Sequence, residues 1–172
     1  MTAKQVLDGP ALLQKIRRIA FQIYENNFEE SEIVIAGIVG EGFAFAERVN
    51  PDMLEQHQRQ IRAEGYPAYS VSPAGDREGY FPITLIEPFE ARNQRAFGYD
   101  MFSEPVRREA MQRAMDTGQP SVSGLVQLKQ GDGRSSSAGF LIYLPVYKKG
   151  ADLSSTDARR QAIRGFVYSP FF

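Results

Sequence analysis

Two long apolar segments in the last third of the chain constrain its fold more than any other feature. The segments "SVSGLVQLKQ" (121–130) and "GFLIYLPVY" (139–147) each have strand length, and the polar loop "GDGRSSSA" joins them. A loop of this kind is typical of a hairpin, so we expect antiparallel pairing. The segments "YPAYSV", "YFPITLIEPF" and "IRGFVY" also have strand length and are bounded by turn-forming residues. The second half of the chain is therefore predicted to be rich in strands.

Two helices are predicted in the first half. Residues 11–24 place one apolar stripe opposite basic and polar residues, the stripe being Leu12, Leu13, Ile16, Ile19, Ala20, Ile23 and Tyr24. The run "IVIAGI" (33–38) that follows suits a strand buried on both faces. The next helix is expected to begin with Asn50 as its cap and Pro51 in its first turn, and to end at Gly65.

A third helix is predicted after residue 103. Ser103 is positioned to accept from the free N–H groups of the first turn, and Pro105 is tolerated there. Ala110 and Ala114 continue the fourfold spacing begun by Val106, and Gly118 followed by Pro120 ends the helix. Together these elements predict an α+β fold: an antiparallel sheet with flanking helices and an N-terminal amphipathic helix.

Composition excludes several classes of function. A chain of 172 residues with 42% hydrophobic and 24% charged residues is typical of one globular domain, and a net charge of −1 gives no general attraction to nucleic acid. The absence of cysteine excludes disulfides, zinc–thiolate sites and thiol nucleophiles. With no long apolar run and no signal peptide, the chain is expected to contact a membrane only through flanking helices outside it.

No catalytic constellation stands out. His57, the only histidine, lies among Gln and Glu on a predicted helix, so it is given no role and no triad can be built around it. No carboxylate pair or metal-ligand cluster is visible, so neither a metal nor a cofactor is expected. This pattern favours binding over catalysis.

Two glycine-containing segments raise phosphate binding as an alternative function. Gly37, Gly40 and Gly42 follow an apolar segment and resemble a phosphate-binding turn, although their spacing differs from a dinucleotide fingerprint and tight turns use glycine for steric reasons alone. The stretch "DTGQPS" (116–121) follows an amphipathic helix instead of a strand, so Gly118 is better interpreted as a helix cap.

Residues 61–120, "GFLIYLPVYKKGA" and "RRQAIRGFVYSPF" together resemble the CHASE domain, the extracytoplasmic ligand-sensing module of receptor histidine kinases and diguanylate cyclases. The resemblance runs from Gly37 or Asn50 to Phe172. It implies PAS-like α/β modules after a long N-terminal helix, with a ligand held on the antiparallel sheet.

The resemblance also implies ligand-binding residues. In the plant cytokinin receptors of the family, the acid in the block matching "YDMFSE" hydrogen-bonds the ligand, and that position is Asp100 here. The other matching positions are Tyr80, Thr84, Val122, Gly124, Leu141 and Tyr143. Purine specificity is not implied, because the flanking residues differ from the plant pattern.

The first 45 residues resemble a different family. Their helix, strand and glycine turn are similar to the opening of a phosphoribosyltransferase, which indicates a chimera, an engineered N-terminus or a divergent natural leader. We therefore divide the chain into residues 1–45 and a sensor domain at 46–172. Transferase activity is not expected, since no Thr/Gly-rich loop with two adjacent acids follows an apolar strand downstream.

These observations predict a non-enzymatic sensor domain that binds a small molecule and belongs to the periplasmic or extracellular part of an inner-membrane receptor. A phosphoribosyltransferase-related nucleotide-binding protein is the first alternative, and an engineered fusion without assayed function is the second. A homodimer is expected if the apolar stripe of residues 12–24 pairs, whereas burial of this stripe against the chain's own sheet is the alternative.

Overall fold

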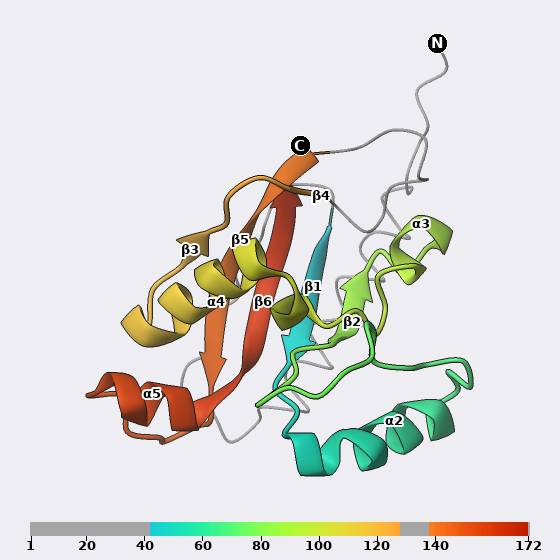
Figure 1. Ribbon diagram of the computed structural model, residues 1–172. Helices are drawn as coiled ribbons and strands as arrows, with labels where there is room; N and C mark the ends of the chain where they lie inside the picture. Colours follow the sequence, from blue (N-terminus) through green and yellow to red (C-terminus); the bar gives the residue numbers. More distant parts are fainter. Residues whose placement is uncertain (1–41, 128–137, 172) are drawn as a thin grey trace, which may run out of the picture. The chain divides into compact units, whose positions relative to one another are not determined.

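The computed structural model describes residues 42–127 and 138–171, and within them an antiparallel sheet forms the centre of the fold (Figure 1). Six strands make up the sheet of this described part: β1 (Phe43–Glu47), β2 (Ile83–Glu87), β3 (Ser121–Val122), β4 (Val126–Gln127), β5 (Ala138–Tyr147) and β6 (Ile163–Phe171). Their order is β2-β1-β6-β5-β3, and β4 also pairs with β5. All of these pairs are antiparallel, which confirms the predicted α+β class.

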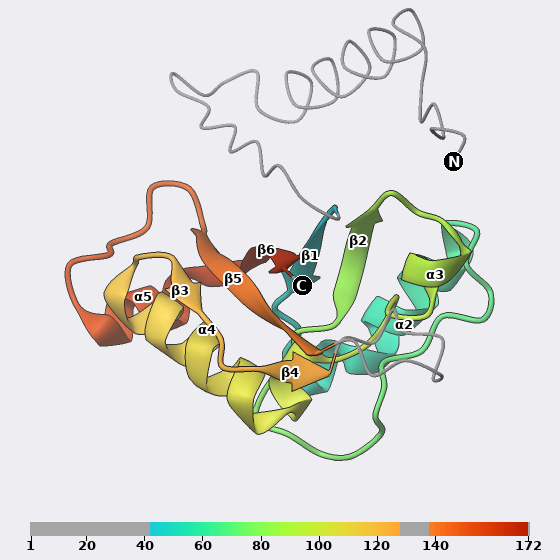
Figure 2. The same ribbon diagram turned by 90° about the horizontal axis from the view of Figure 1, so that it is seen from above.

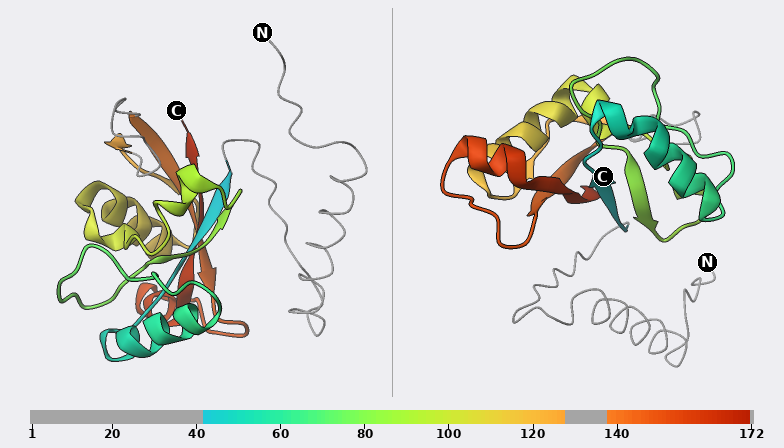
Figure 3. Two further views of the ribbon diagram at one scale, coloured as in Figure 1. Left: turned by 90° about the vertical axis from the view of Figure 1, so that its right-hand side faces the viewer. Right: turned by 90° about the horizontal axis from the view of Figure 1, so that it is seen from below.

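Helices lie on one side of the sheet and beyond its end. The helical elements are η1 (Pro51–Met53), α2 (Leu54–Ala63), α3 (Ala91–Gln94), η2 (Met101–Ser103), α4 (Pro105–Thr117) and α5 (Thr156–Ala162). Helix α4 packs against β5 and β3 and lies beside α5, as the views of Figures 2 and 3 both show. No helix in the described ranges is long and apolar enough to cross a membrane.

The core lies between α4 and the sheet. Alternate residues of β5 face this side, so Leu141 and Tyr143 are buried while Ile142 and Leu144 are only half-buried on the opposite side. From α4 the core receives Ala110, Met111 and Ala114, which recur at helical spacing. The central aromatic ring on β6 is Phe166, which is fully buried.

The ends of α4 follow the sequence signals with one exception. Pro105 occupies the first turn, and Gly118 ends the helix in the left-handed conformation at φ 71°, both as predicted. The predicted cap Ser103 is wrong: Glu104 accepts hydrogen bonds from the N–H groups of Val106 and Arg107. The Ser103 hydroxyl donates to the Asp100 carbonyl oxygen instead.

The glycine turn before β1 has a steric function. Gly42 has φ 116°, and a Cβ atom there would lie 2.2 Å from the Glu87 carbonyl oxygen on β2. A strand follows it, not the helix that a phosphate-binding turn requires, so this interpretation is wrong for Gly42. Gly37 and Gly40, the predicted helix at 11–24 and the predicted strand at 33–38 lie outside the described residues.

Several predicted strands are shorter than expected. Residues 66–71 form no strand, and in "YFPITLIEPF" only Ile83–Glu87 is a strand. The segment 121–130 is interrupted at Ser123, whose hydroxyl accepts from the Leu141 N–H in place of a backbone carbonyl. The prediction for the second helix is confirmed in part. Pro51 begins η1, and Gly65 follows the end of α2. Asn50, the predicted cap, makes no side-chain capping bond.

Candidate ligand site

Asp100 precedes η2, and its side chain is fully buried. Its Oδ1 accepts hydrogen bonds from the backbone N–H of Phe81 at 2.8 Å and of Phe102 at 3.0 Å. The carboxylate thus ties the segment that precedes β2 to the segment that precedes α4. These bonds are one physical reason for an acid at a buried position, because each would otherwise leave an N–H group without an acceptor.

The second oxygen of Asp100 faces an arginine. Oδ2 is buried and has no hydrogen-bond partner among the described residues, and it lies 3.4 Å from Nη1 of Arg77. The Arg77 guanidinium also donates to the Pro73 carbonyl oxygen and lies over the Tyr80 ring, 5.5 Å from the ring centroid. Burial raises the pKa of Asp100, although the two backbone hydrogen bonds and the Arg77 charge oppose this shift.

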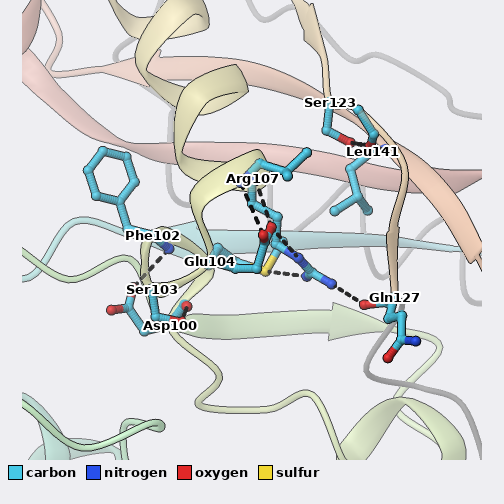
Figure 4. Close-up of polar contacts among 11 residues, drawn as sticks. Asp100, Phe102, Ser103, Glu104, Arg107, Ser123, Gln127 and Leu141 are labelled. Atoms are coloured by element: carbon cyan, nitrogen blue, oxygen red, sulfur yellow. Dashed lines mark hydrogen bonds and ion pairs between the residues drawn. The ribbon is translucent and has the colours of Figure 1, made fainter.

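Arg107 is a second buried charge, on the first turn of α4 (Figure 4). Its side chain extends toward Gln127, where Nη2 donates to the carbonyl oxygen at 2.6 Å, and Nη1 lies 3.3 Å from the sulfur of Met101. Nε is buried without a hydrogen-bond partner in the described part of the chain, although Oε2 of Glu104 is 3.8 Å from it. Of the three guanidinium nitrogens, Nε is therefore the one that makes no hydrogen bond to a described residue.

Tyr143 brings a third polar group to the same side of the sheet. Its ring is fully buried on β5, and its hydroxyl has no hydrogen-bond partner among the residues that the structure describes. Burial raises the pKa of Tyr143 well above its usual value, and the positive charge of Arg107 acts in the opposite direction. A buried hydroxyl without a partner costs stability, so its presence needs a functional or structural reason.

The structure places the predicted site residues in three groups. Asp100 and Tyr80 both contact Arg77, and they lie next to the segment that precedes β2. Leu141 and Tyr143 are buried side by side on the core face of β5, which pairs with β3. The remaining positions are more open: Thr84 is half-buried, and Val122 and Gly124 are exposed.

The first two groups meet through an aromatic ring. The Phe166 ring on β6 lies 5.3 Å from the ring of Phe81 and 6.2 Å from that of Tyr143, measured between centroids. Gly124 also lies close to α4, since a Cβ atom there would be 3.0 Å from Cγ1 of Val106. Asp100, Leu141, Tyr143 and Gly124 therefore lie along the core face of the sheet near the first turn of α4.

Sequence reasoning missed Arg107 and Glu104. A signal for Arg107 was available, because it shares the buried stripe of α4 with Ala110, Met111 and Ala114 at spacings of three, four and seven. A charged residue on such a stripe is rarely buried without a partner or a function. Glu104 had no such signal, since acids before a helix are common as exposed caps.

Hydrogen-bonding groups of both kinds lie near the first turn of α4. Arg107 and Tyr143 offer hydrogen-bond donors, and Asp100 offers an acceptor on the other side of the first turn of α4. The described residues contain no group of three or more metal-ligating side chains. His57 makes a structural contact, with Nε2 2.9 Å from the Tyr69 hydroxyl, and burial lowers its pKa.

The sequence of this chain is similar to that of known proteins. The family model described as the CHASE domain matches residues 14–172. A curated relative, the hybrid signal transduction histidine kinase A of Dictyostelium discoideum, is 30% identical over 106 residues, which is 58% of this chain. The chain spans only 5% of the length of that relative. The boundary at residues 45 and 46 and the phosphoribosyltransferase resemblance of residues 1–45 stay predictions, and the family match includes most of this segment.

Proposed function

The chain belongs to the CHASE domain family, and from this premise we propose that it is the ligand-binding part of a transmembrane receptor with a histidine kinase output domain. CHASE domains are extracellular sensor domains, which supports a sensor role for this chain. We place the receptor in an inner membrane with this domain on its periplasmic or extracellular side. The similarity to a hybrid histidine kinase favours a kinase over a diguanylate cyclase as the output.

The observation that carries the ligand proposal is the pair of unused donors beneath α4. Arg107 Nε and the Tyr143 hydroxyl are both buried without a hydrogen-bond partner in the described part of the chain. They come from different elements, α4 and β5, and the Arg107 charge influences the pKa of Tyr143. A ligand with hydrogen-bond acceptors would bridge helix and sheet by accepting from both.

Asp100 would contribute the acceptor side of the same recognition. Its Oδ2 is covered by Arg77, whose side chain is 21% exposed and belongs to the segment between residues 73 and 79. A ligand N–H group that reached Oδ2 would displace this guanidinium, and Oδ1 would keep its two backbone bonds. Ligand binding at Asp100 would therefore require movement of an exposed segment and leave the sheet intact.

Signalling would follow from a shift between two packings of α4 on the sheet. A ligand changes such an equilibrium only by its differential affinity for the two states. Contacts to Arg107 and Tyr143 would supply this difference, because the distance between the two residues changes whenever α4 moves relative to β5. The absence of catalytic activity in this chain remains part of the proposal, in keeping with a sensor family.

Replacement of Tyr143 by Phe tests the site. The full 172-residue chain is screened by thermal shift against adenine-type cytokinins, small organic acids, amino acids, nucleotides and phosphoribosyl diphosphate. A ligand at about a hundred times its dissociation constant adds about 2.7 kcal/mol of stability. We expect Tyr143→Phe to fold with unchanged or slightly higher stability, because its hydroxyl has no partner to lose, and to lose the ligand-induced shift.

Tyr147→Phe is the matched control. Its hydroxyl donates to the Met115 carbonyl oxygen at 2.8 Å, so this variant should lose stability but keep the ligand-induced shift. A ligand whose shift persists in both Tyr143→Phe and Asp100→Ala would overturn the site assignment. Stabilisation by phosphoribosyl diphosphate alone would instead favour the alternative function of residues 1–45.

A further inference from the structure

A cavity lies at the opposite end of β1 and β6 from the C-terminus. It has a volume of about 500 Å³ and is lined by Glu47, Arg48, Asn50, Lys148, Arg160, Gln161, Ile163 and Arg164. None of these residues belongs to the site beneath α4. The volume lies within the range of small-molecule sites, but Ile163 is the one aliphatic residue in this lining, whereas most such sites are largely apolar. A strongly polar lining indicates a charged ligand.

The lining carries an excess of positive charge. Four basic side chains contribute to it, while Glu47 is the one acid among its residues. Arg160 is already neutralised by Asp116, which accepts two hydrogen bonds from its guanidinium, each 2.7 Å long. When Glu47 and Asp116 are set against the four cations, two positive charges remain. An anion with two charges would balance them.

Arg48 has unused hydrogen-bonding capacity in this region. Its Nε is buried without a hydrogen-bond partner among the described residues, and its guanidinium lies over the Phe81 ring, 5.5 Å from the centroid. Gly79 leaves room for this position, since a Cβ atom there would be 3.0 Å from Cζ of Arg48. A planar guanidinium held by an aromatic ring is preorganised to receive an oxyanion.

Glu47 offsets only part of the positive charge that would attract an anion to the cavity. Burial raises its pKa, while the nearby charge of Arg164 lowers it. Its Oε2 lies 3.8 Å from Nδ1 of His57. Burial lowers the pKa of His57, so the imidazole is not counted among the positive charges at neutral pH. The excess of positive charge therefore comes from the arginines and Lys148.

We propose that this cavity binds a doubly charged oxyanion, either a dicarboxylate or a phosphate monoester. Arg164 and Lys148 hold its charged groups from β6 and from the segment after β5, and Arg48 contributes from the end of β1. The site is independent of the ligand site beneath α4, so either can fail without the other. It gives the sensor a second input, located where the ends of β1, β5 and β6 meet α5.

Isothermal titration of the full chain at low ionic strength tests the proposal. Succinate and glycerol 3-phosphate serve as the two dianion ligands, acetate as a monoanion and glycerol as a neutral control. We expect at least one dianion to bind more tightly than acetate, and glycerol not to bind. Arg164→Gln and Lys148→Gln should each weaken dianion binding about tenfold, the usual contribution of one charge-assisted hydrogen bond.

Arg59→Gln is the matched control, because Arg59 is an exposed arginine on α2 whose partner is Glu55 and not a residue of the cavity. Dianion binding should be unchanged in this variant. The proposal is overturned if neither dianion binds more tightly than acetate, or if Arg59→Gln weakens binding as much as the cavity variants. Circular dichroism of each variant establishes that the fold is kept, and binding of only one dianion identifies the class of ligand.

Discussion

At the scale of single residues, Asp100 combines a structural role with a proposed binding role. The carboxylate holds the N–H groups of Phe81 and Phe102 and faces Arg77 with its other oxygen. Asp100→Ala should lower the free energy of unfolding by about 2–4 kcal/mol, because both N–H groups lose their acceptor. Asp100→Asn should cost less, since an amide oxygen still accepts. Urea denaturation measures both values, and equal losses would contradict this account.

The same residue gives a pH dependence with a definite sign. Burial raises the pKa of Asp100 in the folded state, although Arg77 and Arg108 favour the charged form. An acid with a raised folded-state pKa destabilises the fold as it ionises, so stability should fall as pH rises from the usual pKa of an aspartate to the raised value. Asp100→Asn should lack this part of the pH profile. A stability advantage of the parent over Asp100→Asn that grows as pH rises would indicate the opposite shift.

At the scale of elements, two residues before α4, Ser103 and Glu104, are candidates for the cap of this helix. Glu104 accepts from two N–H groups of the first turn and lies near Arg107, whereas the Ser103 hydroxyl bonds the Asp100 carbonyl oxygen. Glu104→Ala should therefore lower stability by about 1–2 kcal/mol, and Ser103→Ala by less than about 1 kcal/mol. Thermal or urea unfolding of the two variants provides the comparison. A larger loss for Ser103→Ala would restore the cap predicted from sequence.

The helices and strands also show which features local sequence patterns predict correctly. Pro105 and Gly118 mark the ends of α4 because each has a backbone preference that acts without distant contacts. The strand predicted at 66–71 did not form, although Tyr69 in it is buried. Its ring packs against Phe97 and His57 instead of entering a ladder. Strand formation needs a partner edge, which a local pattern does not report.

At the scale of the whole molecule, the expected homodimer is a prediction about residues outside the described ranges. If the stripe from Leu12 to Tyr24 pairs, the full chain should sediment as a dimer, and Ile16→Asp should convert it to a monomer. Lys15→Gln, on the polar side of the same predicted helix, should leave the dimer unchanged. A monomeric parent chain whose melting temperature falls in Ile16→Asp would show that the stripe is buried within one chain.

The sequence by itself predicted the α+β class, the strands β5 and β6, and the antiparallel pairing of residues 121–130 with β5. It also predicted Pro105 and Gly118 at the ends of α4, although not the cap Glu104. These features depend on periodicity and on the backbone preferences of a few residues. Its family resemblance also selected Asp100, whose role in binding remains to be measured. Only the tertiary structure decided that Arg107 and Tyr143 are buried with unused donors, and that Lys148 and Arg164 line one cavity with Arg48. Such groupings depend on contacts between residues far apart in the chain, which no local pattern encodes.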